Sequence, residues 1–231
     1  MNINEKKSFD VIVIGGGAAG MMAAITAASN GADTMILEHK DRVGKKILST
    51  GNGKCNYTNE LQGVTYYRGD DPAFVLPVME QFGFEETVSF FEKLGIYPKN
   101  RNGYYYPASE QAASVSDVLR MELTFRHVAV VTECELRNIS EKKNGFLLET
   151  GKGRFSAQKI IFATGLLAAP KTGSDGSAIP LIKAFGPFAA LSALSSPLIA
   201  SEIALICALI SSTVAFSASQ TSFAAASAFW N

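Results

Sequence analysis

This chain of 231 residues has no excess charge of either sign, because lysine plus arginine and aspartate plus glutamate each number 21. Balanced charge excludes the basic surface typical of nucleic-acid-binding proteins, so we expect a small-molecule partner and no nucleic-acid partner. Cysteine is scarce, and Cys55, Cys134 and Cys207 lie far apart with no CxxC pair. This spacing excludes a dithiol redox centre and a CxxC zinc site, so we expect reduced thiols and no metal.

Two segments lack the residues that would direct the chain to a membrane or out of the cell. Residues 1–9 are polar and carry lysines, without the apolar core of a secretory signal, so we expect a cytoplasmic protein. Residues 187–231 are mostly alanine, serine and leucine, with Glu202 as the one charged side chain. Residues 198–216 approach the length of a membrane span, but their serines and Glu202 weigh against a membrane partner.

Three interpretations of residues 187–231 remain open. The segment is membrane-associated, or it is an apolar dimerising or scaffold segment, or it is a tail that is not native to the fold, as a shifted reading frame or a truncated gene would produce. We favour the last, because the segment has neither the charged face of a surface helix nor the polar residues of loops. We therefore divide the chain into a domain of residues 1–186 and a tail of residues 187–231.

A glycine-rich turn stands out in the stretch FDVIVIGGGAAGMMAAITAASNGADTMILE near the N-terminus. The short apolar run at residues 10–14 predicts a buried parallel strand. Residues 18–30, rich in alanine and methionine, predict a helix that ends at Gly31, and residues 34–37 predict a second strand. Together these segments predict a βαβ unit that opens with glycines.

The glycines follow the spacing Gly15-x-Gly17-x-x-Gly20. In a dinucleotide-binding fingerprint the first glycine permits the tight turn, the second lets a pyrophosphate approach the backbone, and the third lets the helix pack on the strand. The phosphates would meet the free amides at the start of the helix. Glu38 ends the second strand, where a carboxylate accepts hydrogen bonds from ribose hydroxyls and repels a 2′-phosphate. This arrangement favours FAD or NAD over NADP.

The remaining pattern predicts a ligand loop, a hairpin and a β-meander. The run KIIFATG, an apolar strand closed by small residues, favours FAD over NAD, although an ordinary buried strand is the alternative. Cys55 has no partner thiol or neighbouring histidine in the sequence, so we name no catalytic residue. The predicted elements are a loop at 44–59, a helix at 85–94, a hairpin turn at Asn102–Gly103, a helix capped by Ser109 and running to about 123, and strands at 128–139, 145–150 and 159–165.

Five segments together resemble the BaiN-type family of NAD(P)/FAD-dependent oxidoreductases, also called aminoacetone-oxidase-like enzymes. They are VIVIGGGAAGMMAAI, GKKILSTGNGKCNYTN, GYYYPASEQAASV, IIFATG and APKTGSDGS, and they span roughly residues 9–186. The resemblance implies an α/β fold: a Rossmann-like FAD-binding domain of the two-dinucleotide-binding flavoprotein type, with a β-meander. Family members are longer, and their substrate domain and closing C-terminal segment have no counterpart here, so we expect a truncated domain followed by a tail unlike the family.

The resemblance also implies cofactor contacts. The pyrophosphate would lie on the glycine turn, the ribose on Glu38, the adenine against the backbone of Leu136, and the flavin near the loop and the strand end. The implied residues are Gly15, Gly17, Ala18, Ala19, Gly20, Glu38, Lys45, Lys46, Ser49, Gly51, Gly53, Cys55, Asn56, Leu136, Ala163, Thr164 and Gly165.

The resemblance implies an FAD-dependent oxidoreductase that moves a hydride between NAD(P)H and an organic acceptor. A lysine beside the flavin would stabilise its reduced anionic form, and Lys45, Lys46 and Lys54 are the candidates. The alternatives are an FAD-binding module without turnover and a membrane-associated remnant. Neither the acceptor, nor the electron donor, nor the oligomeric state follows from these residues.

Overall fold

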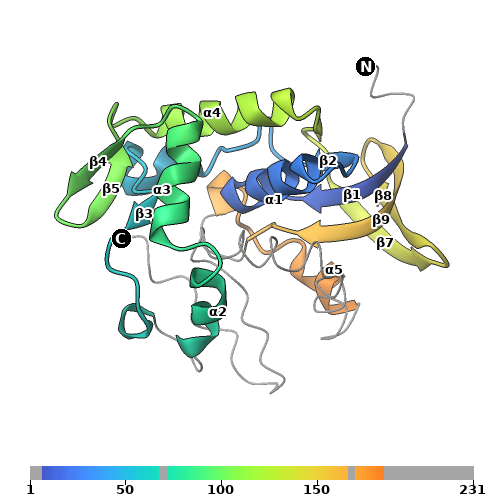
Figure 1. Cartoon of the computed structure of the whole chain (residues 1–231). Coiled ribbons are helices and arrows are strands. Elements are labelled where there is room, and N and C mark those ends of the chain that lie inside the picture. Colours follow the sequence, from blue (N-terminus) through green and yellow to red (C-terminus); the bar gives the residue numbers. More distant parts are fainter. Residues whose placement is uncertain (1–6, 68–71, 166–169, 185–231) are drawn as a thin grey trace.

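The computed structural model describes residues 7–67, 72–165 and 170–184 (Figure 1). The predictions for residues 187–231 therefore lie outside the described residues. Within the described ranges, no helix is both long and apolar enough to cross a membrane.

A six-stranded sheet with the order β6-β2-β1-β9-β8-β7 forms the centre of the fold. Four neighbouring strands, β6, β2, β1 and β9, run parallel, and β7 and β8 continue as an antiparallel meander that returns through β9. The predicted meander and its returning strand are thus confirmed. The strands are β1 (Ser8–Ile14), β2 (Thr34–Leu37), β6 (Ala129–Val131), β7 (Leu136–Lys142), β8 (Gly145–Thr150) and β9 (Gly153–Phe162).

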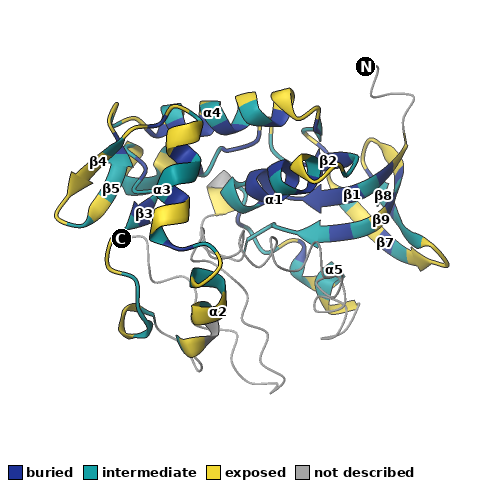
Figure 2. Ribbon diagram, viewed as in Figure 1, coloured by how far each residue is buried: buried dark blue, intermediate teal, exposed yellow. Residues whose placement is uncertain are grey.

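The central strands are buried on both faces, as Figure 2 shows for β1 and β2. Along β1, Val11 and Val13 face a core that includes α1 and α4, whereas Ile12 and Ile14 face a second core with residues of β7, β8 and β9. Because parallel strands are covered on both sides, they read as continuous apolar runs, which is why the sequence predicted them. The covering helices are α1 (Ala18–Ser29) and α4 (Ala112–Phe125).

A small second sheet, with the order β3-β5-β4, lies apart from the main sheet (Figure 1). Its hairpin turns at Asn102 and Gly103, both with positive φ, as the sequence predicted. The remaining elements are β3 (Thr58–Asn59), β4 (Pro98–Arg101), β5 (Tyr104–Pro107), α2 (Leu76–Met79), α3 (Phe84–Lys93), α5 (Ile179–Ala184) and the 3₁₀ turns η1 (Ile47–Gly53), η2 (Val64–Tyr66), η3 (Pro72–Val75) and η4 (Pro170–Thr172).

Two local predictions are wrong. Ser109 does not cap α4: Gln111 occupies the N-cap position, and the Ser109 hydroxyl instead accepts the Gln111 N–H at 3.3 Å, because Glu110 turns the chain with φ +53°. Residues 128–139 do not form one strand. The chain turns at Glu133, with φ +47°, and splits into β6 and β7.

Candidate functional site

The glycine turn is shaped first by the packing of the chain against itself. Gly15 has φ +101°, and a Cβ on it would lie 2.5 Å from the carbonyl oxygen of Ala163. A Cβ on Gly20 would overlap the carbonyl oxygen of Gly15. The first and third glycines of the fingerprint are therefore required by close backbone packing, as the sequence analysis expected.

Gly17 is different, because nothing in the described protein explains its lack of a side chain. A Cβ there would meet no atom within 4 Å, and its φ of −70° is open to any residue. Gly17 is also the N-cap of α1, which has no side-chain cap and no acidic residue in its first turn. Within the described residues, the N–H groups of Ala18 and Ala19 donate to no acceptor, and with the positive end of the helix dipole they face an open space that suits an anion.

Glu38 is a buried carboxylate with 7 % of its surface exposed. Its Oε2 accepts the N–H of Gly16 at 2.7 Å, and its Oε1 accepts the N–H of Lys40 at 2.7 Å. The carboxylate is therefore fixed beside the glycine turn, across the carboxyl ends of β1 and β2. In parallel α/β sheets this edge is where ligands bind.

Gly16 is a site residue that the sequence analysis did not single out. It donates to Glu38, accepts the Gly44 N–H at 2.7 Å, and has no room for a Cβ, which would overlap the side chain of Val43. The sequence did contain a signal for Gly16. The fingerprint uses Gly15 and Gly17 of the three consecutive glycines, so it does not explain why residue 16 is also a glycine.

The end of β9 lies against the same crevice. The Ala163 N–H donates to the Ile14 carbonyl at 2.8 Å, which places residues 163–165 beside the glycine turn. Gly165 has φ +69°, and a Cβ on it would lie 2.5 Å from Oγ of Ser174. The small residues after β9 therefore let residues 173–177 approach the strand ends. The structure thus brings together the glycine turn, Glu38 and Ala163–Gly165.

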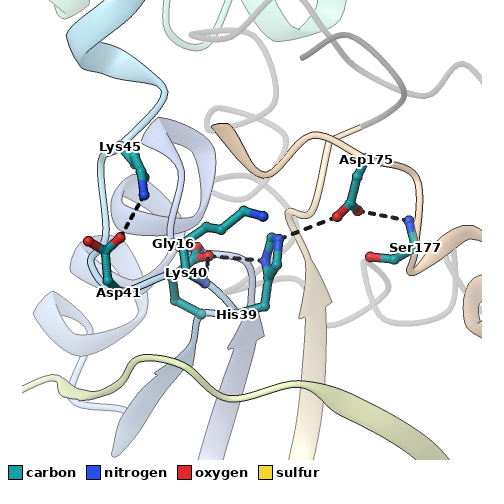
Figure 3. A network of polar contacts seen from close by, with 8 residues as sticks. Gly16, His39, Lys40, Asp41, Lys45, Asp175 and Ser177 are labelled. Atoms are coloured by element: carbon teal, nitrogen blue, oxygen red, sulfur yellow. Dashed lines mark hydrogen bonds and ion pairs between the residues drawn. The ribbon is translucent and has the colours of Figure 1, made fainter. Parts of the chain in front are cut away.

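His39 is a second residue that the sequence analysis did not place in the site. Figure 3 shows it between the strand ends and Asp175, whose carboxylate also accepts the Ser177 N–H at 3.0 Å. The imidazole Nδ1 lies 3.1 Å from Oε1 of Glu38, and Nε2 lies 3.5 Å from Oδ2 of Asp175. No sequence pattern signals this arrangement, because Asp175 follows His39 by more than a hundred residues.

The loop predicted to approach a flavin begins at the crevice and then leaves it for the small sheet. Gly44 bonds to the glycine turn, but the ammonium of Lys45 pairs with Asp41 at 2.9 Å (Figure 3). Lys46 is half-buried, and burial lowers its pKa. Ser49 is exposed and donates to the Lys46 carbonyl.

Four other residues of this loop pack within the loop or against the small sheet. A Cβ on Gly51 would lie 2.6 Å from the Asn56 nitrogen, and Gly51 and Gly53 both have positive φ. The Asn56 amide donates to the Tyr105 carbonyl at 3.1 Å, which ties the loop to β5. Cys55 is buried, and burial raises the pKa of its thiol, so the thiolate required of a nucleophile is disfavoured.

Leu136, expected beside an adenine, is the first residue of β7 and half-buried. The chain just before it does border the crevice, since the Cys134 N–H donates to the Glu38 carbonyl at 2.9 Å and the Glu133 N–H to the Lys40 carbonyl at 2.8 Å. A backbone contact from this segment to an adenine on Glu38 stays a prediction.

Comparison with known proteins finds the same fold in oxidoreductases. Residues 9–190 match the HI0933-like protein Rossmann domain. The chain is 45% identical over 176 residues to the 3-dehydro-bile acid delta(4,6)-reductase of Clostridium scindens, covering 75% of this chain and 43% of that protein. It is 26% identical over 178 residues to the ribosomal RNA dihydrouridine synthase of Escherichia coli, covering 77% and 44%. The chain thus spans less than half the length of these relatives.

Among solved structures, the 3-ketosteroid-Δ4-(5α)-dehydrogenase of Rhodococcus jostii superimposes with a TM-score of 0.52 at 16% identity, covering 80% of this chain and 55% of that one. At this identity the likeness concerns the fold alone. These matches confirm the α/β Rossmann class and the family resemblance drawn from the five sequence segments.

Proposed function

Because the chain belongs to the HI0933-like protein Rossmann domain family, we propose that it is the FAD-binding part of a flavoprotein oxidoreductase. The observation that carries the proposal is the open space over Gly17, at an uncapped helix N-terminus, with the fixed carboxylate of Glu38 on the next strand. An FAD pyrophosphate fits over Gly17, Ala18 and Ala19, where backbone N–H groups bind anions.

The adenosine half of FAD has its partners in the same crevice. Two backbone N–H groups occupy part of the Glu38 carboxylate, and no other donor in the described ranges hydrogen-bonds to Oε2, so its remaining lone pair is available to a ribose hydroxyl. A 2′-phosphate beside this buried carboxylate would be repelled, so the site favours FAD over NADP.

At the flavin half, the small residues Ala163, Thr164 and Gly165 leave room beside the strand ends, and a lysine is available. Lys45 and Lys54 pair with Asp41 and Glu110, whereas no carboxylate of the described residues lies within ion-pair distance of Lys46. We therefore assign to Lys46 the stabilisation of reduced flavin. FAD, when bound, supplies the hydride acceptor and donor that the protein's own side chains lack.

For the whole protein we propose hydride transfer from NAD(P)H to an organic acceptor, by way of the flavin. The reductase of C. scindens, 45% identical, carries in its name the reduction of a bile acid, which supports a small apolar acceptor with a conjugated double bond. The balanced charge of the chain favours such a molecule over ribosomal RNA. The proposal places the protein in the cytoplasm, where Cys55 and Cys134, both unpaired, stay reduced.

The test is FAD binding by the purified protein and by Gly17→Leu. We expect absorbance near 450 nm in the wild type and loss of most bound flavin in Gly17→Leu, because the leucine fills the pyrophosphate position. Gly151→Leu is the matched control, since a Cβ there meets its nearest atom at 3.7 Å and lies on the exposed β8–β9 turn. Equal flavin in all three proteins would refute the proposed site.

Turnover separates the enzyme from its alternative, an FAD-binding module that does not react. The reconstituted protein is mixed with NADH or NADPH under anaerobic conditions, and bleaching of the flavin is followed. Reduction by either nucleotide supports the oxidoreductase. Bound flavin that neither nucleotide reduces supports the module.

A further inference from the structure

His39 joins two carboxylates that come from distant parts of the chain (Figure 3). Its Nδ1 lies 3.1 Å from Glu38, at the end of β2, and its Nε2 lies 3.5 Å from Asp175, which follows β9. The ring is two-thirds buried, with 33 % of its side chain exposed. A single imidazole therefore connects the proposed ribose carboxylate to residues 173–177.

Residues 173–177 are placed against His39 by packing as well as by charge. A Cβ on Gly173 would lie 3.0 Å from Cε1 of His39, so a glycine is needed where this segment crosses the ring. On its other side the segment meets the end of β9, where Ser174 lies against Gly165. The segment is thus held between the ring and the strand end.

Asp175 is ionised at neutral pH. The Ser177 side chain and backbone hydrogen-bond to this carboxyl, and His39 and Lys40 add positive charge nearby, so its pKa lies below the ordinary value. The charged groups that face His39 are therefore Glu38 and Asp175, with Lys40 beside them. The imidazole lies within ion-pair distance of both carboxylates at once.

Glu38 gains a third polar neighbour from this arrangement. The N–H groups of Gly16 and Lys40 hydrogen-bond to its two oxygens, and Nδ1 of His39 lies 3.1 Å from Oε1. His39 and Lys40 both lie against Oε1, so among the described residues Oε2, the oxygen bound by Gly16, is the less crowded of the two. The rotation of the carboxylate is thereby fixed.

We propose that His39 is a positioning residue that orients Glu38 for a ribose hydroxyl and couples this carboxylate to residues 173–177, so that a dinucleotide bound at Glu38 also immobilises that segment. This inference rests on the proposed function and deepens it, since it links the adenosine site to the segment beside the small residues after β9.

Four variants test separately the contact of His39 with Glu38 and its contact with Asp175. His39→Asn keeps a polar amide near the Nδ1 position and removes Nε2, whereas His39→Phe removes both nitrogens. Asp175→Asn removes the charge at the far end and leaves His39 intact. His127→Asn is the control, because His127 is the other histidine of the chain, is exposed, and has a positive φ that asparagine tolerates.

Each protein is titrated with FAD by fluorescence quenching, and amide hydrogen exchange of residues 170–177 is measured with and without saturating FAD. We expect FAD to slow exchange at 173–177 in the wild type and in His127→Asn. Asp175→Asn should bind FAD within about twofold of wild type yet lose most of this protection, and His39→Asn should lose most of it as well. His39→Phe should lose the protection and weaken FAD binding about three- to tenfold, because Glu38 loses the polar contact with the ring.

Full protection of residues 173–177 in both His39→Asn and Asp175→Asn would overturn the coupling. If the wild type bound no FAD, the proposed function would fail first, and exchange in the ligand-free proteins would still decide the link. If His39 holds residues 173–177, their amide hydrogens should exchange faster in ligand-free His39→Asn than in the ligand-free wild type. Equal exchange rates would refute the contact between His39 and this segment. Thermal unfolding by circular dichroism verifies that each variant is folded.

Discussion

The crevice at the ends of β1, β2 and β9 and the small sheet β3–β5 hold their carboxylates in opposite ways. The side chain of Glu38 in the crevice is 9 % exposed and is bound by backbone N–H groups that close glycine packing fixes. Glu110 beside the small sheet is 27 % exposed and is bound by the long side chains of Lys99 and Arg101, with Lys54 at 4.0 Å.

The difference shows where rigidity lies in this molecule. Backbone amides cannot move away without unfolding the turn that carries them, whereas lysine and arginine side chains reorient in solvent and their ion pairs are screened by salt. A change in the crevice should therefore be far more damaging than the matched change in the small sheet. Three paired experiments test this contrast, and a fourth experiment concerns a half-buried tyrosine next to the small sheet.

The largest contrast is between Gly20→Ala and Gly103→Ala. A Cβ on Gly20 would overlap the Gly15 carbonyl oxygen, so the turn must move, and we expect a loss of about 3 kcal/mol or more in the free energy of unfolding. Gly103 has φ +87° and only Glu60 nearby at 3.9 Å, so alanine there should cost about 1 kcal/mol. Urea denaturation measures both, and equal losses would contradict the contrast.

Core truncation gives the next effect. Ile36 in β2 is fully buried, and Ile36→Ala should destabilise the protein by about 2–5 kcal/mol through lost burial and a cavity. Tyr97, just before β4, is 71 % exposed, and Tyr97→Ala should change stability by no more than about 0.5 kcal/mol. Midpoints of thermal unfolding check the order. A larger loss for Tyr97→Ala would reverse the assignment of the core.

The two carboxylates form the third pair. Glu38→Gln replaces one acceptor oxygen by an amide that faces a buried backbone N–H, which should destabilise by about 1–3 kcal/mol. Glu110→Gln should destabilise by less than about 1 kcal/mol. Repeating both urea titrations in high salt sharpens the result, because only the Glu110 effect should vanish. A salt-sensitive Glu38 effect would be evidence against its burial.

The smallest effect concerns Tyr57, which packs on Phe91 next to the small sheet with ring centroids 4.9 Å apart. Burial, with the nearby charge of Glu92 as a second cause, raises its pKa from about 10 to about 12. The unfolded chain therefore releases the phenol proton first as pH rises, so the stability that neutral Tyr57 contributes is present below pH 10 and is lost between pH 10 and 12.

Tyr57→Phe removes this loss. The decrease in the urea midpoint from pH 8 to pH 11 should be smaller in Tyr57→Phe than in the wild type. The other titrating groups contribute equally to both proteins. Parallel declines would show that Tyr57 titrates as an exposed tyrosine.

The sequence predicted the parts of this molecule whose signals are local. The run from β1 through α1 to β2 has strand, glycine turn and helix in unbroken order, and Asn102–Gly103 marks its hairpin directly. The prediction that Ser109 caps α4 was wrong because Glu110 has a positive φ, so the helix begins later in the chain. No residue propensity predicts a glutamate in the left-handed conformation.

The candidate site was predictable only in part for a related reason. Gly15, Gly17, Gly20 and Glu38 lie within one βαβ unit, so spacing alone relates them. His39 lies 3.5 Å from Asp175, which the topology brings beside it after β9 returns to the sheet centre. Long-range pairing of this kind leaves no periodic trace in the chain.

The most direct test of the central claim compares ADP-ribose with its 2′-phosphorylated form by titration calorimetry, since both need only the crevice around Gly17 and Glu38. We predict that ADP-ribose binds at least about tenfold more tightly, and that Glu38→Gln narrows the difference, because the buried carboxylate accepts a 2′-hydroxyl and repels a 2′-phosphate. Equal affinities in the wild type, or no binding of either nucleotide, would contradict the account.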